Sequence, residues 1–139
     1  MRVFVDTNTL LDVLARREPF YAASARIWSM AESGQIQAFI SAISFNNVYY
    51  VVRKADSRKK ADAAMRLLRD VFKSVAPDEQ ILNQAIDSGM SDFEDAVQYF
   101  SAVRARVGHL VTRNPADFPT EPIAVVSPEE FLAAIDESR

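Results

Sequence analysis

The sequence predicts an α/β fold in which helices flank a mainly parallel sheet. Short apolar runs alternate with amphipathic segments along the chain, and this alternation is typical of strand–helix units whose strands pair in parallel. The first run, Val3 to Val5, starts almost at the first residue and has the composition of a strand that is buried on both faces. A length of 139 residues fits one domain over residues 1–139.

Five apolar runs of three or four residues are expected to form the strands. The first, second and last of these runs are apolar throughout. The third, Ser-Val-Ala, and the fourth, His-Leu-Val-Thr, also contain polar residues. The expected strands are residues 3–5, 38–40, 74–76, 109–112 and 123–126.

Seven segments between these runs carry apolar residues at the three- and four-residue spacing of a helix. Ser44 is expected to cap the third helix, and two Ser-x-x-Glu capping boxes, Ser91 with Glu94 and Ser127 with Glu130, are expected to begin the last two helices. Thr7 or Asn8 is expected to cap the first. The expected helices are about residues 8–14, 21–32, 44–54, 60–72, 78–86, 92–106 and 128–135.

Composition excludes several kinds of site. The chain has no cysteine, so it has no disulfide, no thiolate zinc ligand and no thiol nucleophile. Apolar runs are too short for a signal peptide or a membrane span, which predicts a cytoplasmic protein without membrane contact. The net charge of −3 averages two opposed segments, because residues 53–73 carry +5 and residues 78–95 carry −6.

Acidic side chains are expected at the edge of the sheet where parallel strands end, which is where sites form in such sheets. Asp6 ends the first strand, Asp92 and Asp95 lie at the start of a helix, and Asp117 follows the strand at 109–112. Each has a structural alternative, because acids also cap helices and stabilise turns. Together they suggest oxygen ligands for Mg²⁺ or Mn²⁺, which would polarise a phosphodiester and activate water.

Several motifs, taken in order, resemble the PIN domain family and in particular the VapC-like toxin ribonucleases of bacterial toxin–antitoxin pairs. The resemblance spans essentially the whole chain. The matching segments are residues 3–11 (VFVDTNTLL), 40–50 (ISAISFNNVYY), 92–99 (DFEDAVQY), 110–118 (LVTRNPADF) and 126–132 (VSPEEFL). The resemblance implies a three-layer α/β/α fold and a metal-dependent endoribonuclease that cleaves single-stranded RNA. It also implies a homodimer, which a cognate antitoxin protein holds inactive.

The resemblance also implies the site residues. Asp6, Asp95 and Asp117 would be catalytic and, with Asp92, would bind the metal. Supporting residues would orient these carboxylates or water, namely Thr7, Asn8, Asn46, Asn47, Thr112 and Asn114. The sequence departs from the family at one position, because many members carry a glutamate where this chain has Asn47 or, as the second choice, Asn46. The loss of one negative charge predicts weaker metal binding.

The basic side chains near these segments are candidates for binding RNA phosphates. Arg113 lies next to the acidic residues in the sequence and is the first candidate, and Arg53 and Lys54 open the basic segment. The alternative for the basic segment is an ordinary solvated helix face.

Two other functions remain open at the level of sequence. The asparagines at 46 and 47 favour a PIN module that binds RNA or an antitoxin without cleaving, whereas the retained acids favour a nuclease. A receiver-like or phosphatase-like domain would use Asp6 as a nucleophile, but the segment Asp6-Thr7-Asn8 lacks the second acid of such sites.

Overall fold

The computed structural model describes residues 1–137 and shows a five-stranded sheet with all of its strand pairs parallel. The strand order is β3-β2-β1-β4-β5, so the first strand lies at the centre of the sheet. Val3 pairs with Ala38 on one side and with His109 on the other. The strands are β1 (Arg2–Val5), β2 (Gln37–Ser41), β3 (Lys73–Val75), β4 (His109–Val111) and β5 (Ala124–Val126).

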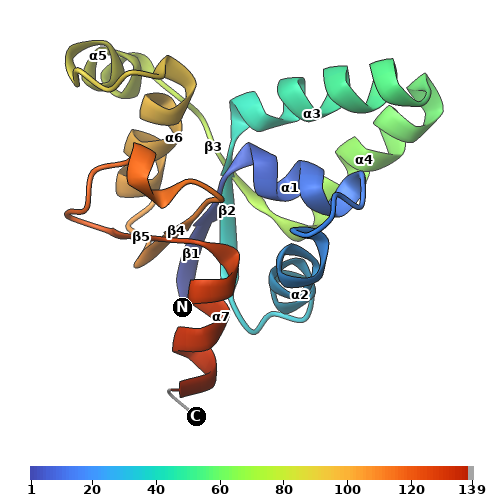
Figure 1. The fold of residues 1–139 in the computed structure, drawn as a ribbon. Coiled ribbons are helices and arrows are strands. Elements are labelled where there is room, and N and C mark those ends of the chain that lie inside the picture. Colours follow the sequence, from blue (N-terminus) through green and yellow to red (C-terminus); the bar gives the residue numbers. More distant parts are fainter. Residues whose placement is uncertain (138–139) are drawn as a thin grey trace.

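Helices cover both faces of this sheet, which gives three layers (Figure 1). Alternate residues of β1 serve the two faces, because Val3 and Val5 pack against α1, α2, α4 and α7 whereas Phe4 packs against α6. The helices are α1 (Thr7–Leu14), α2 (Tyr21–Glu32), α3 (Ala42–Ala55), α4 (Arg58–Val71), α5 (Glu79–Asp87), α6 (Phe93–Arg104) and α7 (Pro128–Glu137), with a short 3₁₀ helix, η1 (Pro115–Asp117). The expected three-layer α/β/α fold is confirmed.

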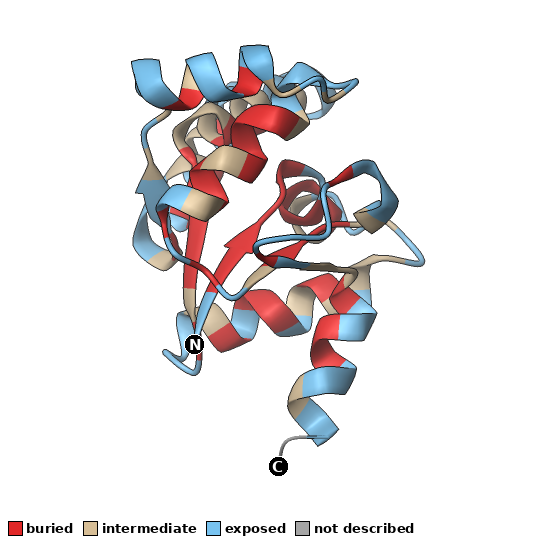
Figure 2. Ribbon diagram, turned by 90° about the vertical axis from the view of Figure 1, so that its left-hand side faces the viewer, coloured by how far each residue is buried: buried red, intermediate tan, exposed pale blue. Residues whose placement is uncertain are grey.

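The buried residues lie on the strands and on the inward sides of the helices, as Figure 2 shows. The strand β1 lies in the core, and its residues Val3 and Phe4 are fully buried. A central strand buried on both faces explains why its apolar run is continuous and not alternating. Among residues 1–137, no helix combines the length and apolar character that are needed to span a membrane.

The expected strands and helices are all present, but four helices begin elsewhere than expected. Asp6, and not Thr7 or Asn8, occupies the N-cap position of α1, so this helix already begins at Thr7. Ser41 caps α3 by accepting a hydrogen bond from the Ile43 amide at 3.2 Å, so Ser44 lies inside the helix. Ser57 caps α4. Asp92 and not Ser91 caps α6, because the Asp92 carboxylate accepts a hydrogen bond from the Asp95 amide at 2.9 Å. At α1, α3 and α6 the sequence offers more than one polar residue that is able to cap the helix, so the residue types alone do not select the first residue.

The second capping box is confirmed. Ser127 accepts a hydrogen bond from the Glu130 amide at 3.1 Å, and Glu130 accepts one from the Ser127 amide at 3.0 Å. This reciprocal pair fixes the start of α7 directly after β5.

Candidate functional site

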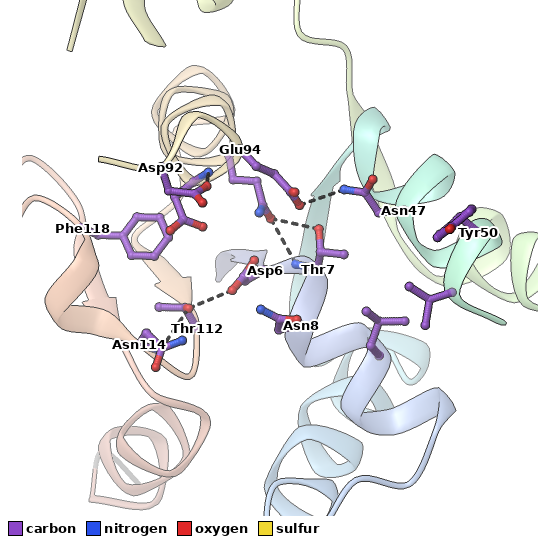
Figure 3. A pocket seen from close by; sticks show the side chains of 14 residues that line it. Asp6, Thr7, Asn8, Asn47, Tyr50, Asp92, Glu94, Thr112, Asn114 and Phe118 are labelled. Atoms are coloured by element: carbon purple, nitrogen blue, oxygen red, sulfur yellow. Dashed lines mark hydrogen bonds between the residues drawn. The ribbon is translucent and has the colours of Figure 1, made fainter. Parts of the chain in front are cut away.

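A cleft of about 410 Å³ opens at the edge of the sheet where β1 and β4 end (Figure 3). Four parts of the chain form its walls: the β1–α1 junction, α3, the start of α6 and the segment after β4. The lining side chains are Asp6, Thr7, Asn8, Leu11, Asn47, Tyr50, Val51, Asp92, Glu94, Asp95, Gln98, Thr112, Asn114 and Phe118.

Asp6 lies at the centre of the cleft, directly after β1. Its residue surface is only 4% exposed, and burial raises the pKa of its carboxyl group. Thr112 opposes this shift by donating a hydrogen bond from Oγ1 to Asp6 Oδ2 at 2.8 Å. Asp6 occupies the N-cap position of α1, but its side chain makes no capping hydrogen bond, so the carboxylate is available to the cleft.

The start of α6 brings three more carboxylates to the same cleft. Asp92 accepts the capping hydrogen bond from the Asp95 amide at 2.9 Å, so its capping role and its place in the cleft coexist. Glu94 accepts a hydrogen bond from Asn47 Nδ2 at 2.8 Å, which joins α6 to α3 across the cleft.

Asp95 also has a raised pKa, and the neighbouring acids contribute to it. Burial, which has the largest effect, and the negative charges of Asp92, Asp6, Asp117 and Glu94 together raise the pKa of its carboxyl group to about 7. No lysine or arginine is among the residues that line this cleft in the described part of the chain. The cleft therefore concentrates negative charge without a protein cation to balance it.

Hydrogen bonds between uncharged groups connect the elements at the base of the cleft. The Thr7 amide donates to Gln98 Oε1 at 3.1 Å, and the hydroxyl groups of Thr7 and Ser44 lie 2.7 Å apart. These bonds connect α1 to α6 and α3, so the three walls keep a fixed relation around Asp6.

The structure brings most of the predicted site residues together, but not all of them. Asp117 is exposed on η1 and does not line the cleft, although its charge contributes to the raised pKa of Asp95. Asn47 lines the cleft, whereas its neighbour Asn46 is exposed and does not. Arg53 and Lys54 are exposed at the end of α3, outside the lining.

Arg113 has a partner within the protein. Its Nε lies 2.8 Å from Asp12 Oδ2, and its Nη2 donates to Asp12 Oδ1 at 2.9 Å. The guanidinium carbon also lies 4.2 Å from the centre of the Phe20 ring. Because Asp12 is fully buried, the ion pair faces the interior of the protein. Contact of Arg113 with a substrate phosphate stays a prediction.

Sequence reasoning did not single out six of the lining residues, and two of these, Glu94 and Gln98, accept hydrogen bonds from other walls of the cleft. Glu94 was assigned to a capping box with Ser91, and that assignment concealed its contact with Asn47. A signal was present in the helical spacing, because Gln98 follows Glu94 and Asp95 by four and three residues and shares their side of α6.

The donor set suits a hard divalent cation. Four carboxylates and several neutral oxygen donors line the cleft, which is the chemistry that Mg²⁺ and Mn²⁺ prefer. Within residues 1–137, no three acidic or histidine side chains already lie close enough to hold one ion. Water would complete the coordination, as is usual for Mg²⁺.

Comparisons with known proteins agree with this architecture. The model of the PIN domain family matches residues 2–116. A toxin–antitoxin complex from Klebsiella pneumoniae has a TM-score of 0.68 at 23% identity and covers 91% of this chain and 97% of that chain. A DNA-bound VapBC complex from Salmonella typhimurium has a TM-score of 0.70 at 15% identity, over 92% and 98% of the two chains.

A VapC toxin from Mycobacterium tuberculosis, described as cleaving the sarcin–ricin loop, has a TM-score of 0.63 at 15% identity and covers 78% of this chain and 86% of that chain. No curated protein matches the chain. At these identities the solved structures establish the fold alone, but the family model matches most of the chain and confirms the resemblance found in the sequence. The chain belongs to the PIN domain family.

Proposed function

We propose that this protein is a metal-dependent endoribonuclease of the toxin type, which hydrolyses phosphodiesters in single-stranded RNA. The observation that carries the proposal is the group of carboxylates in the cleft with no protein cation among them, where the pKa of Asp95 reaches about 7. Such unbalanced charge is costly in the absence of a cation and favours the binding of a divalent one.

Asp6 and Asp95 would hold Mg²⁺ or Mn²⁺, with Asp92, Glu94 and Asp117 as the other available acids. A bound ion of this kind polarises the phosphodiester and lowers the pKa of a coordinated water for in-line attack. The protein's own part is positional. Thr112 orients the Asp6 carboxylate, and Asn47 holds the Glu94 carboxylate toward the cleft.

The proposed partners follow from the family and from the compared structures. The Klebsiella and Salmonella structures are toxin–antitoxin complexes, and this supports an antitoxin protein as the partner of this chain. We also infer a homodimer, as the family resemblance implies, and a cytoplasmic location, as the short apolar runs of the sequence predict. The basic residues of segment 53–73, which includes the exposed Arg53 and Lys54, support RNA as the substrate class.

A second candidate is a PIN module that binds RNA or an antitoxin without cleaving. Asn47 favours it, because an amide stands where many family members carry a glutamate. The hydrogen bond from Asn47 to Glu94 weakens this alternative, since it holds a different glutamate, from the facing α6 wall, beside Asn47.

Cleavage assays on single-stranded RNA with Mg²⁺ or Mn²⁺ test the proposal. We expect cleavage by the natural protein, its loss in EDTA, and its loss in the Asp6→Asn and Asp95→Asn variants. Asp87→Asn is the matched control, because Asp87 is an exposed acid on α5 that does not line the cleft. Full activity in the Asp6 and Asp95 variants would contradict the site. RNA binding without cleavage under every metal condition would establish the second candidate.

A further inference from the structure

We propose that the apolar end of the cleft, formed by Leu11, Tyr50 and Val51, binds a nucleobase of the RNA strand. In this proposal Tyr50 is the stacking surface and Lys54 binds an adjacent phosphate. The inference rests on the proposed function and deepens it, because it names the part of the nucleotide that lies beside the carboxylates.

The cleft has two chemically distinct ends. Asp6, Asp92 and Glu94 lie between β1, β4 and α6, whereas Tyr50 lies apart from them on α3 (Figure 3). Leu11 of α1 and Val51 of α3 also line the cleft, and the three side chains offer hydrocarbon and aromatic surface. Leu11 and Val51 have no metal-binding atoms in their side chains, so this end adds nothing to a metal site. A nucleotide requires both chemistries, because its phosphate is anionic and its base presents a flat, largely apolar face.

Tyr50 is an exposed aromatic residue at the wall of the cleft. Its residue surface is 63% exposed, and yet its side chain lines the cleft that contains Asp6. A single exposed apolar residue needs no functional explanation when it lies elsewhere on a surface. At the wall of a cleft, the free ring surface is available to a ligand. Tyrosine is a common platform for stacking of single-stranded nucleic acid.

The residues on one side of α3 change in chemical character along the helix. Tyr50 and Val51 follow Asn47 by three and four residues, and Lys54 follows them by four and three, so the four residues share one side of the helix. With a rise of about 1.5 Å per residue, Lys54 lies roughly 10 Å along the axis from Asn47, with Tyr50 between them. This side of α3 is therefore polar and then aromatic where it lines the cleft, and cationic just beyond the lining.

Charge makes an RNA strand the preferred occupant. Lys54 Nζ lies 5.6 Å from the centre of the Tyr50 ring, so a cation adjoins the aromatic surface directly. Arg53 is the neighbouring residue and is also exposed. A phosphate that follows the stacked base would meet these cations, whereas the acidic end of the cleft repels a phosphate unless a divalent cation is bound. A protein segment is the competing occupant, and the experiment separates the two.

Binding of a short, fluorescein-labelled single-stranded RNA to the full chain tests the inference, with and without Mn²⁺ and at constant salt. We expect Tyr50→Ala to weaken binding about tenfold and Tyr50→Trp to preserve it, because base stacking contributes at about that level. Lys54→Met is expected to weaken binding less and to reduce its salt dependence. Phe93→Ala is the control, because Phe93 is 53% exposed and does not line the cleft.

A second measurement identifies the group that stacks. Trp28 is the one tryptophan of the chain and is buried at 7% exposure, so Tyr50→Trp adds a tryptophan that reports on the cleft. We expect RNA to quench the new fluorescence, and an oligonucleotide with abasic sites to leave it unchanged. Equal quenching by both oligonucleotides would overturn the nucleobase assignment.

The failures of the two proposals are distinguishable. If the natural protein cleaves RNA and Tyr50→Ala binds and cleaves equally well, the inference is wrong and the proposed function stands. A loss of antitoxin binding alone in Tyr50→Ala would assign this surface to the protein partner and would overturn the inference. If the natural protein neither binds nor cleaves single-stranded RNA, both proposals are wrong.

Discussion

Asp6 and Asp12 lie six residues apart, and both are buried, but their surroundings differ in charge. Asp12 is fully buried against the Arg113 guanidinium at 2.8–2.9 Å, and Arg17 Nη1 lies 3.9 Å from its Oδ1. Asp6 is 4% exposed and is held by the neutral hydroxyl of Thr112 at 2.8 Å. The same residue type therefore has a balanced charge at one position and an unbalanced charge at the other.

The difference shows that the buried acid of the fold has a paired cation, whereas the acids of the cleft have none among residues 1–137. The Asp12–Arg113 pair joins α1 to the segment after β4, and Arg113 is flanked by two residues of the cleft, Thr112 and Asn114. The acids of the cleft receive no such cation, and they raise one another's pKa values. A buried ion pair contributes little net stability but is costly to break, whereas unbalanced acids are costly until a cation binds.

The largest expected effect comes from breaking the balanced pair. Arg113→Met should lower the free energy of unfolding by about 3–5 kcal/mol, because it leaves Asp12 buried without its partner. Urea unfolding measures this loss. Arg104→Met is the control, because Arg104 pairs with Asp78 at 2.9 Å on the exposed surface, where the loss of an ion pair changes stability little.

The double variant Asp12→Leu with Arg113→Met should recover most of the loss, because it removes both buried charges together. One result for Arg113→Met would contradict the structural role that we assign to the Asp12–Arg113 pair. Unchanged stability together with a raised KM for RNA would mean that Arg113 serves the substrate and not the fold.

The next effect concerns the pH dependence of the metal-free protein. The carboxyl group of Asp95 has a folded-state pKa of about 7 against an ordinary value of 3.8, so the folded protein retains a proton that the unfolded chain has lost. Stability should therefore fall as pH rises from about 4 to about 7 and then level off. Raised pKa values at Asp6 and Glu94 act in the same direction.

Thermal unfolding in EDTA at pH 5 and pH 8 measures this dependence. The natural protein should lose several degrees of Tm between the two values relative to Asp95→Asn, which cannot titrate at that position. Saturating Mn²⁺ should remove most of the difference, because the metal binds the deprotonated carboxylates. A greater Tm gain on raising the pH in the natural protein than in Asp95→Asn would contradict the assigned pKa shift.

The sequence predicted the fold well because its signals are local. Continuous apolar runs such as residues 3–5 predict buried parallel strands, and helical spacing then predicts the flanking layers. The acids at strand ends were predicted for the same reason, since Asp6 follows β1 directly. Contacts between distant segments were not predictable in this way. Arg113 meets Asp12 across 101 residues, and Asn47 meets Glu94 across 47, so neither pair has a signature in the local pattern.

The smallest expected effect tests how the cleft accommodates Asn47. Asn47→Glu places a carboxylate against Glu94, whose Oε1 accepts the Asn47 hydrogen bond at 2.8 Å, so the metal-free protein should become less stable. Mn²⁺ affinity should rise by about fivefold, because one further charge at about 4 Å in a wet cleft is worth roughly 1 kcal/mol. Calorimetric titration measures the affinity, with Asn46→Glu as the control outside the cleft. Equal affinities in the two variants would mean that position 47 lies too far from the metal to bind it, and that Glu94 alone supplies the acid at this wall.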